Sequence, residues 1–276
     1  MTIRIALCCP GKPIRRERAD AVLALAKREY PGVTLEFHQQ CFAREGHFAG
    51  NDGTRAGAFL DCANDPAFDA VWFAMGGYGS NRIAREAMDG VAASARDKVY
   101  LGYSDCGTLL GALYRDRIGQ PVHGPLAGDI KHEGGEDAVR RVLDYFVGNA
   151  QGLEPELDDR PSAAFNLMTL AMLVGTEFMP DLAGHVVLVE EVAEYHYAID
   201  RLFFHVTQHL RDVAGIRLGQ VTDVPENDRP FGMDEVEIAR HWCAQAGIPY
   251  LGRAQIGHSA SNRIVPFGLA GSAHRS

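Results

Sequence analysis

The chain has 276 residues, of which 46% are hydrophobic and 23% charged, and its formal net charge at pH 7 is −9. This length and composition are typical of a soluble globular protein with room for one large or two modest domains. Its basic residues are scattered and no apolar run approaches the ~20 residues of a membrane span, so we expect neither a nucleic-acid nor a membrane partner.

The first half of the sequence alternates short apolar runs with helical periodicity. Strands are predicted over residues 3–9, 33–38, 70–75 and 98–103, and helices over 15–30, 54–64, from 81 onward and over 137–147. Strands that alternate with helices predict a parallel, Rossmann-like sheet with helices on both faces. Because ligands bind such sheets at the carboxyl ends of the strands, the loops that follow the third and fourth strands are candidate site segments.

The pattern changes after a polar, proline-containing stretch over 148–164, which is the best linker candidate. Strands or buried segments are predicted over 165–174 and 185–189, helices over 197–213 and 235–246, and a strand-like segment over 219–223. We therefore expect an α/β domain over 1–150 and a smaller β-rich or α+β domain over 160–276.

The cysteine pattern favours a reducing compartment. The chain contains neither a C-x-x-C pair nor a common zinc-binding spacing, which suits free thiols. The N-terminal segment resembles a first strand and lacks the longer apolar region and cleavage site of a secretory signal. We expect a cytoplasmic protein.

The most informative stretch is Gly102-Tyr103-Ser104-Asp105, where an apolar strand runs into an apolar helix. A serine at a sharp strand-to-helix turn exposes its hydroxyl at the edge of the sheet, and the unpaired N–H groups of the helix can face a developing oxyanion. Ser104 is thus a candidate nucleophile. The alternative, a serine that only caps the helix, is the more common meaning of this pattern.

A second candidate is the loop Gly76-Gly77-Tyr78-Gly79-Ser80, called the glycine loop below. Glycines let the backbone approach a ligand closely, so the loop can present N–H groups to an anion. Phosphate binding is a rival interpretation, although neither G-x-G-x-x-G nor a Walker motif is complete. A tight structural turn is a third.

Two further residues can complete a hydrolytic site. Glu190 ends an apolar strand, where it can orient a histidine or simply face water. His258 follows a glycine in a late loop, and it is one of eleven histidines. Together with Ser104 they supply a nucleophile, a base and an orienting acid in the chain order Ser, Glu, His.

At these residues the sequence resembles the LD-carboxypeptidase (muramoyltetrapeptide carboxypeptidase) family, including its microcin-immunity branch, over nearly the whole chain. The matching motifs are the stretch 46–52 with Arg55, Gly76-Gly77-Tyr78-Gly79, Gly102-Tyr103-Ser104-Asp105, His123-Gly124-Pro125, Leu188-Val189-Glu190-Glu191 and Gly257-His258. Two positions depart from the family pattern. Phe165 stands where the family usually has glycine, and Gly128 stands where it more often has serine.

The resemblance implies a serine hydrolase with an active site between two domains, without a metal or other cofactor, and a homodimer. It implies Ser104 as the nucleophile, His258 as general base and acid, and Glu190, rather than its neighbour Glu191, as the orienting residue. The backbone N–H groups of Gly77 and Asp105 would form the oxyanion hole. On this basis the first domain carries the nucleophile and the oxyanion loop, and the second carries the acid and the histidine.

The implied reaction is removal of the terminal D-amino acid from a murein tetrapeptide during peptidoglycan recycling. A first alternative is a microcin-immunity-like serine peptidase that acts on a peptide–nucleotide or acyl-adenylate analogue. A second is a non-catalytic protein that holds an anionic ligand on the glycine loop. Cys106 as the nucleophile is a weaker option, since no histidine is placed for it by the sequence.

Overall fold

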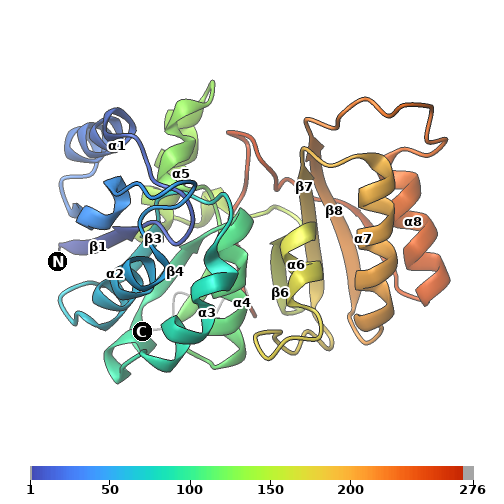
Figure 1. The fold of residues 1–276 in the computed structure, drawn as a ribbon, viewed down its shortest axis with the longest axis horizontal. Helices are drawn as coiled ribbons and strands as arrows, with labels where there is room; N and C mark the ends of the chain where they lie inside the picture. The colour runs from blue at the N-terminus through green and yellow to red at the C-terminus, as the bar shows by residue number, and fades with distance from the viewer. Residues whose placement is uncertain (1, 270–276) are drawn as a thin grey trace.

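The structure, a computed structural model, describes residues 2–269 of the chain. Figure 1 shows two α/β lobes side by side, the first built from the N-terminal half and the second from the C-terminal half. The segment that follows the last strand of the second lobe runs back to the first lobe (red in Figure 1).

The first lobe contains a six-stranded sheet in the order β10-β5-β4-β3-β1-β2. Its strands are β1 (Ile3–Cys8), β2 (Val33–Phe37), β3 (Ala70–Phe73), β4 (Val99–Gly102), β5 (Gln120–His123) and β10 (Val265–Pro266). The first five are parallel and β10 is antiparallel to β5. The predicted parallel α/β domain is thereby confirmed, with β5 and β10 as additions that the apolar pattern did not reveal.

Helices cover both faces of this sheet. They are α1 (Arg16–Glu29), α2 (Asp52–Asn64), α3 (Ser80–Asp89), α4 (Gly107–Arg115) and α5 (Gly135–Phe146). Successive strand side chains point to opposite faces, so Ala6 and Cys8 pack with α2, α3 and α4, while Ile5 and Leu7 pack with α1 and α5. All four residues of β3 are buried, as expected for a parallel strand with helices on both sides.

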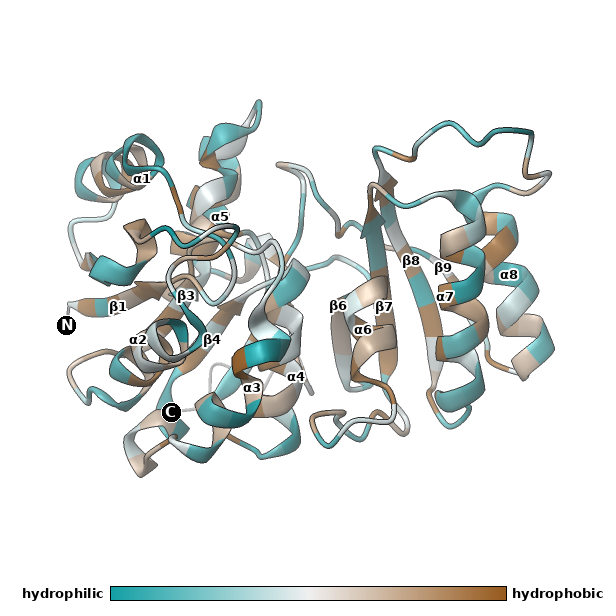
Figure 2. Cartoon of the chain, in the orientation of Figure 1, coloured by the Kyte–Doolittle hydropathy of each residue, from teal (hydrophilic) through white to brown (hydrophobic). Residues whose placement is uncertain are grey.

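The second lobe contains four strands in the order β6-β7-β8-β9, namely β6 (Ser162–Asn166), β7 (Val186–Val192), β8 (Gly215–Thr222) and β9 (Tyr250–Arg253). All of its neighbouring strands pair in parallel. Its helices are α6 (Leu167–Leu173), α7 (His196–His209) and α8 (Glu235–Ala246). The expected smaller lobe is thus present, and it too is α/β, because helices connect its strands. The segment between β8 and α8 is mostly hydrophilic (teal in Figure 2).

Several local predictions differ from the structure at element boundaries. The segment 165–174 contains the end of β6 and all of α6, because Asn166 accepts a hydrogen bond from the N–H of Thr169 and starts a helix there. The strand-like segment 219–223 is the last part of β8, and β6 begins inside the expected linker. A division of the chain into 1–150 and 160–276 stays a prediction. Within residues 2–269, no helix is both long and apolar enough to cross a membrane.

Candidate active site

Ser104 lies at the carboxyl edge of the first sheet, two residues after β4 ends. It opens a single 3-10 turn, Ser104–Cys106, that leads directly into α4. Its φ of 60° is in the left-handed region, which residues with a side chain rarely adopt. A strained strand-to-helix turn of this kind lifts the serine side chain out of the sheet edge. The predicted sharp turn is therefore present.

Two side chains from the second half of the chain meet this serine. The Nε2 atom of His258 is 3.1 Å from the Ser104 hydroxyl oxygen, and its Nδ1 atom is 2.7 Å from a carboxylate oxygen of Glu190. Glu190 is completely buried near the end of β7, and His258 lies in the segment between β9 and β10. Side chains from three segments that are far apart in the sequence thus form one continuous hydrogen-bond network.

The electrostatics of this network suit a proton acceptor. Burial lowers the pKa of His258, but the charge and hydrogen bond of the Glu190 carboxylate, together with the charges of Asp129 and Glu191, raise it more, so the net pKa is above its ordinary value. An ionised carboxylate only accepts hydrogen bonds, so Nδ1 carries the proton in the neutral ring. Nε2 is then left with a free lone pair directed at the Ser104 hydroxyl.

Glu190 and Glu191 have different surroundings. The Glu191 carboxylate accepts hydrogen bonds from the side-chain amide of Asn166 and from the backbone N–H groups of Met168 and Val192, at 2.7–2.9 Å. Burial raises the pKa of Glu191 to about 7. Only one of the two carboxylates is hydrogen-bonded to the His258 ring. That residue is Glu190, as expected from the resemblance.

The glycine loop passes directly beside Ser104. A Cβ atom added to Gly76 would lie 3.2 Å from the Cβ of Ser104, so the Ser104 side chain packs closely against this glycine. Gly77 has a φ of 107° and Gly79 a φ of 132°, conformations that favour glycine. The loop can follow this path because these positions lack a side chain.

Asp105 holds the far end of the glycine loop through its side chain. Its carboxylate accepts hydrogen bonds from the N–H of Gly79 at 3.2 Å, the N–H of Ser80 at 2.9 Å and the hydroxyl of Ser80 at 2.7 Å. On the other side of the loop, the buried guanidinium of Arg55 donates to the carbonyl of Gly79 at 2.8 Å. The residue after the candidate nucleophile therefore positions the loop that is proposed to bind the oxyanion.

A cavity of about 300 Å³ opens onto these residues and is lined by both lobes. The first lobe contributes Ser104, Gly76 and Gly77, and the second contributes His258, Val192 and Asp223. The remaining wall includes two lysines, Lys12 and Lys131. Within residues 2–269, no group of three or more His, Cys, Asp or Glu side chains is arranged to hold a metal ion.

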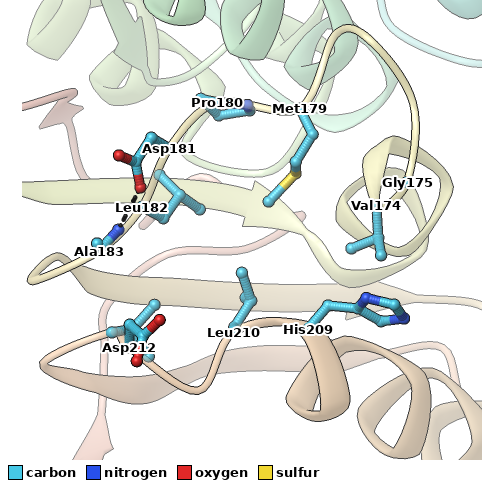
Figure 3. A pocket seen from close by; sticks show the side chains of 11 residues that line it. Val174, Gly175, Met179, Pro180, Asp181, Leu182, Ala183, His209, Leu210 and Asp212 are labelled. Atoms are coloured by element: carbon cyan, nitrogen blue, oxygen red, sulfur yellow. Dashed lines mark hydrogen bonds between the residues drawn. The ribbon is translucent and has the colours of Figure 1, made fainter.

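A second cavity, of about 240 Å³, lies in the second lobe (Figure 3). The connection between α6 and β7 and the end of α7 form its walls, with Met179, Leu182 and Leu210 among the lining residues. Asp181 accepts a hydrogen bond from the N–H of Ala183 there. None of the predicted site residues lines this cavity, so the chemistry belongs to the first one.

Three residues that support His258 were not assigned a role from the sequence. The ring of Tyr103 lies 4.8 Å from that of His258. The amide oxygen of Asn262 is 3.1 Å from Nε2 of His123 and accepts a hydrogen bond from the N–H of Gly257 at 3.1 Å. Burial lowers the pKa of His123 to about 4, so its ring is neutral at pH 7 and can donate this bond. Tyr103 and His123 lie in the quoted motifs, whereas no sequence signal pointed to Asn262.

Cys106 is not arranged as a nucleophile. Its side chain is fully buried beneath the turn, and its thiol lies 3.7 Å from the carbonyl of Met75. Burial raises the pKa of this thiol well above its ordinary value, which disfavours the reactive thiolate.

Comparison with known proteins shows the family to which the chain is similar. The model of the LD-carboxypeptidase N-terminal domain matches residues 5–124, and that of the C-terminal domain matches residues 163–272. The chain is 26% identical to the murein tetrapeptide carboxypeptidase of Pseudomonas aeruginosa, over 96% of this chain and 91% of that protein. The crystal structure of muramoyltetrapeptide carboxypeptidase from Oxalobacter formigenes has a TM-score of 0.79 at 22% identity, covering 96% of this chain and 92% of that one.

The fold is shared with a second group of proteins. The microcin C7 self immunity protein MccF, in complex with aspartyl sulfamoyl adenosine, has a TM-score of 0.83 at 17% identity, covering 97% of this chain and 92% of that one. Taken together, the two family models match most of the sequence, and both lobes of the structure have the corresponding fold. The chain therefore belongs to the LD-carboxypeptidase family of peptidases.

Proposed function

We propose that this protein is a serine-type LD-carboxypeptidase that removes the terminal D-amino acid from a murein tetrapeptide. The observation that carries the proposal is the continuous hydrogen-bond network from the Ser104 hydroxyl through the His258 ring to the buried Glu190 carboxylate. The substrate class is supported by the similarity to the murein tetrapeptide carboxypeptidase of Pseudomonas aeruginosa.

In the proposed reaction, Nε2 of His258 takes the proton of the Ser104 hydroxyl as its oxygen attacks the scissile carbonyl carbon. Glu190 keeps the ring in the required tautomer and stabilises the imidazolium that forms. The backbone N–H groups of Gly77 and Asp105 bind the oxyanion, where one such donor contributes about 3 kcal/mol in enzymes where it has been removed.

The tetrahedral intermediate then collapses. The C–N bond breaks and His258 returns its proton to the departing amine of the terminal D-amino acid. Water, deprotonated by the same ring, attacks the acyl-enzyme ester and releases the tripeptide, which restores the hydroxyl of Ser104.

The direct test is incubation of the purified protein with a disaccharide tetrapeptide and measurement of free D-alanine. We expect release by the native protein and a loss of at least about a thousandfold in the Ser104→Ala variant. Activity that survives this substitution would contradict the assignment of the nucleophile. Absence of D-alanine release by the native protein would reject the substrate.

A second substrate in the same assay separates the two branches of the family. Aspartyl sulfamoyl adenosine is bound by the MccF neighbour, so peptidyl or aminoacyl nucleotide analogues are the natural comparison. Turnover of such an analogue, with none of the tetrapeptide, would assign the chemistry to the microcin-immunity type. A protein of the binding-only type would turn over neither.

We also propose that the protein works as a homodimer in the cytoplasm, where tetrapeptides are recovered during wall recycling. Light scattering coupled to size-exclusion chromatography measures the dimer, and fractionation of cells that produce the protein measures its location. A monomer at assay concentration, or a protein found outside the cytoplasm, would contradict this part of the proposal.

A further inference from the structure

Lys12 is held against the glycine loop. Its backbone N–H donates to the carbonyl of Gly76 at 3.2 Å. Its side chain lies across Gly77, since a Cβ atom added to Gly77 would be 2.8 Å from Cδ of Lys12. The aliphatic part of the lysine therefore packs on the residue proposed to bind the oxyanion, and Lys12 lines the same cavity as Ser104.

Lys131 lines the same cavity from another segment, at the end of the 3-10 turn Ala127–Lys131. Burial and the positive charges of Arg18 and Lys12 lower the pKa of Lys131, while Asp129 partly offsets them. Both lysine side chains therefore line one cavity. Within residues 2–269, neither forms a hydrogen bond or an ion pair through its side chain.

The carboxylates in the cavity wall do not neutralise the two lysines. Asp129 accepts a hydrogen bond from the N–H of Leu126 at 2.9 Å and lies 3.6 Å from the His132 ring. Asp223 is exposed on the other lobe. Among the described residues, Lys12 and Lys131 are the two lysines that line the cavity, and neither forms a side-chain ion pair there.

A peptide cleaved at its last bond carries a free carboxylate close to the reacting carbonyl. One residue spans roughly 3.5 Å, so the carboxylate must lie in the same cavity as the Ser104 hydroxyl. Ammonium groups there would stabilise it through charge-assisted hydrogen bonds. The same cations would give no advantage to a peptide with more than one residue after the scissile bond, because its carboxylate would lie farther away.

We propose that Lys12 and Lys131 form a subsite for the free carboxylate of the leaving D-amino acid and thereby make the enzyme an exopeptidase. This inference rests on the proposed carboxypeptidase function. It adds two specificity-determining residues and the chemical group that they bind.

The test compares two substrates that differ only at that group, a tetrapeptide with a terminal D-alanine acid and the same peptide with a D-alanine amide. The native protein should prefer the acid, in kcat/KM, by roughly ten- to a hundredfold. Lys12→Met and Lys131→Met should each reduce turnover of the acid and leave turnover of the amide unchanged. The double variant should treat both substrates alike.

Methionine keeps the length of the lysine stem, so packing over Gly77 is retained in Lys12→Met. Lys27→Met is the matched control, because Lys27 is exposed in the last turn of α1, at the far end of that helix from the cavity. It removes the same charge and should leave the preference for the acid intact. An equal loss on acid and amide in Lys12→Met would show a role in holding the glycine loop and would overturn the subsite.

Binding to the inactive Ser104→Ala variant separates this inference from the function on which it rests. Calorimetry should show tighter binding of the acid than of the amide, and Lys12→Met should remove the difference. Equal binding of both, in a protein whose native form releases D-alanine, overturns the subsite alone. A native protein that hydrolyses neither peptide overturns the proposed function and the subsite with it.

Discussion

Glu190 and His258 are 68 residues apart in the sequence, yet the Glu190 carboxylate lies 2.7 Å from the His258 ring. The contact joins β7 to the segment that returns from the second lobe to the first. It places a completely buried negative charge behind a ring that faces the Ser104 hydroxyl. The pH dependence of the reaction should therefore depend on this pair.

Replacement of Glu190 by glutamine tests that dependence. His258 must be neutral to accept a proton, so kcat/KM of the native protein should fall as the pH drops through the raised pKa of His258. Glu190→Gln removes the charge that raises this pKa. The acid limb of the profile should shift to lower pH, and the maximum should fall by roughly a thousandfold or more. A profile with an unchanged acid limb would contradict the electrostatic role of Glu190.

Glu191 should affect stability more than catalysis. The pKa of Glu191 is about 7 in the folded protein, against an ordinary value of 4.5 for a glutamate. Between pH 4.5 and pH 7 the folded state therefore binds more protons than the unfolded state. Stability from this group is therefore greatest below pH 4.5 and is lost as the pH rises to 7, by up to roughly 3 kcal/mol. In urea unfolding at pH 5–8, the native protein should lose stability relative to Glu191→Gln as the pH rises. A difference that does not change with pH would contradict the raised pKa.

Asp105 should act on kcat through the glycine loop. Asp105→Asn places an amide N–H₂ where the N–H of Ser80 now donates, so the loop loses its fixed position. We expect kcat to fall about ten- to a hundredfold, because one N–H donor of the proposed oxyanion hole would be misplaced. KM should change little. Ser80→Ala removes only the hydroxyl that donates to Asp105, so its effect should be smaller. A large change in KM would contradict a role confined to the oxyanion loop, and a melting curve like that of the native protein would exclude partial unfolding as the cause of a lower kcat.

Cys106→Ala separates the two candidate nucleophiles. Because the thiol is completely buried and Cys106 does not line the cavity, activity should stay within about threefold of the native level. The lost packing should cost about 1 kcal/mol of unfolding free energy, measured by thermal denaturation. Loss of activity with a normal melting curve would return Cys106 to consideration and weaken the assignment of Ser104.

Much of the fold was predictable because it depends on local patterns. The alternation of apolar runs and helical periodicity over residues 3–103 predicted the parallel sheet, and the sharp turn at Ser104 followed from a strand that runs into a helix. Short strands were missed where the pattern is weak. β5 has four residues and contains Pro121, and β10 has only two, so neither shows a periodicity of its own.

In the candidate site, too, some features depend on neighbouring residues and others on long-range packing. The sequence by itself determined the nucleophile turn, the glycine loop and the family motifs, since each is a run of neighbouring residues whose conformation is set by steric limits and short-range hydrogen bonds. Only the tertiary structure decided that Glu190 faces His258 while Glu191 turns to Asn166, and that Lys12 and Lys131 share the cavity with Ser104. Those relationships join segments that are distant in the chain, and long-range packing leaves no periodic trace in the order of the residues.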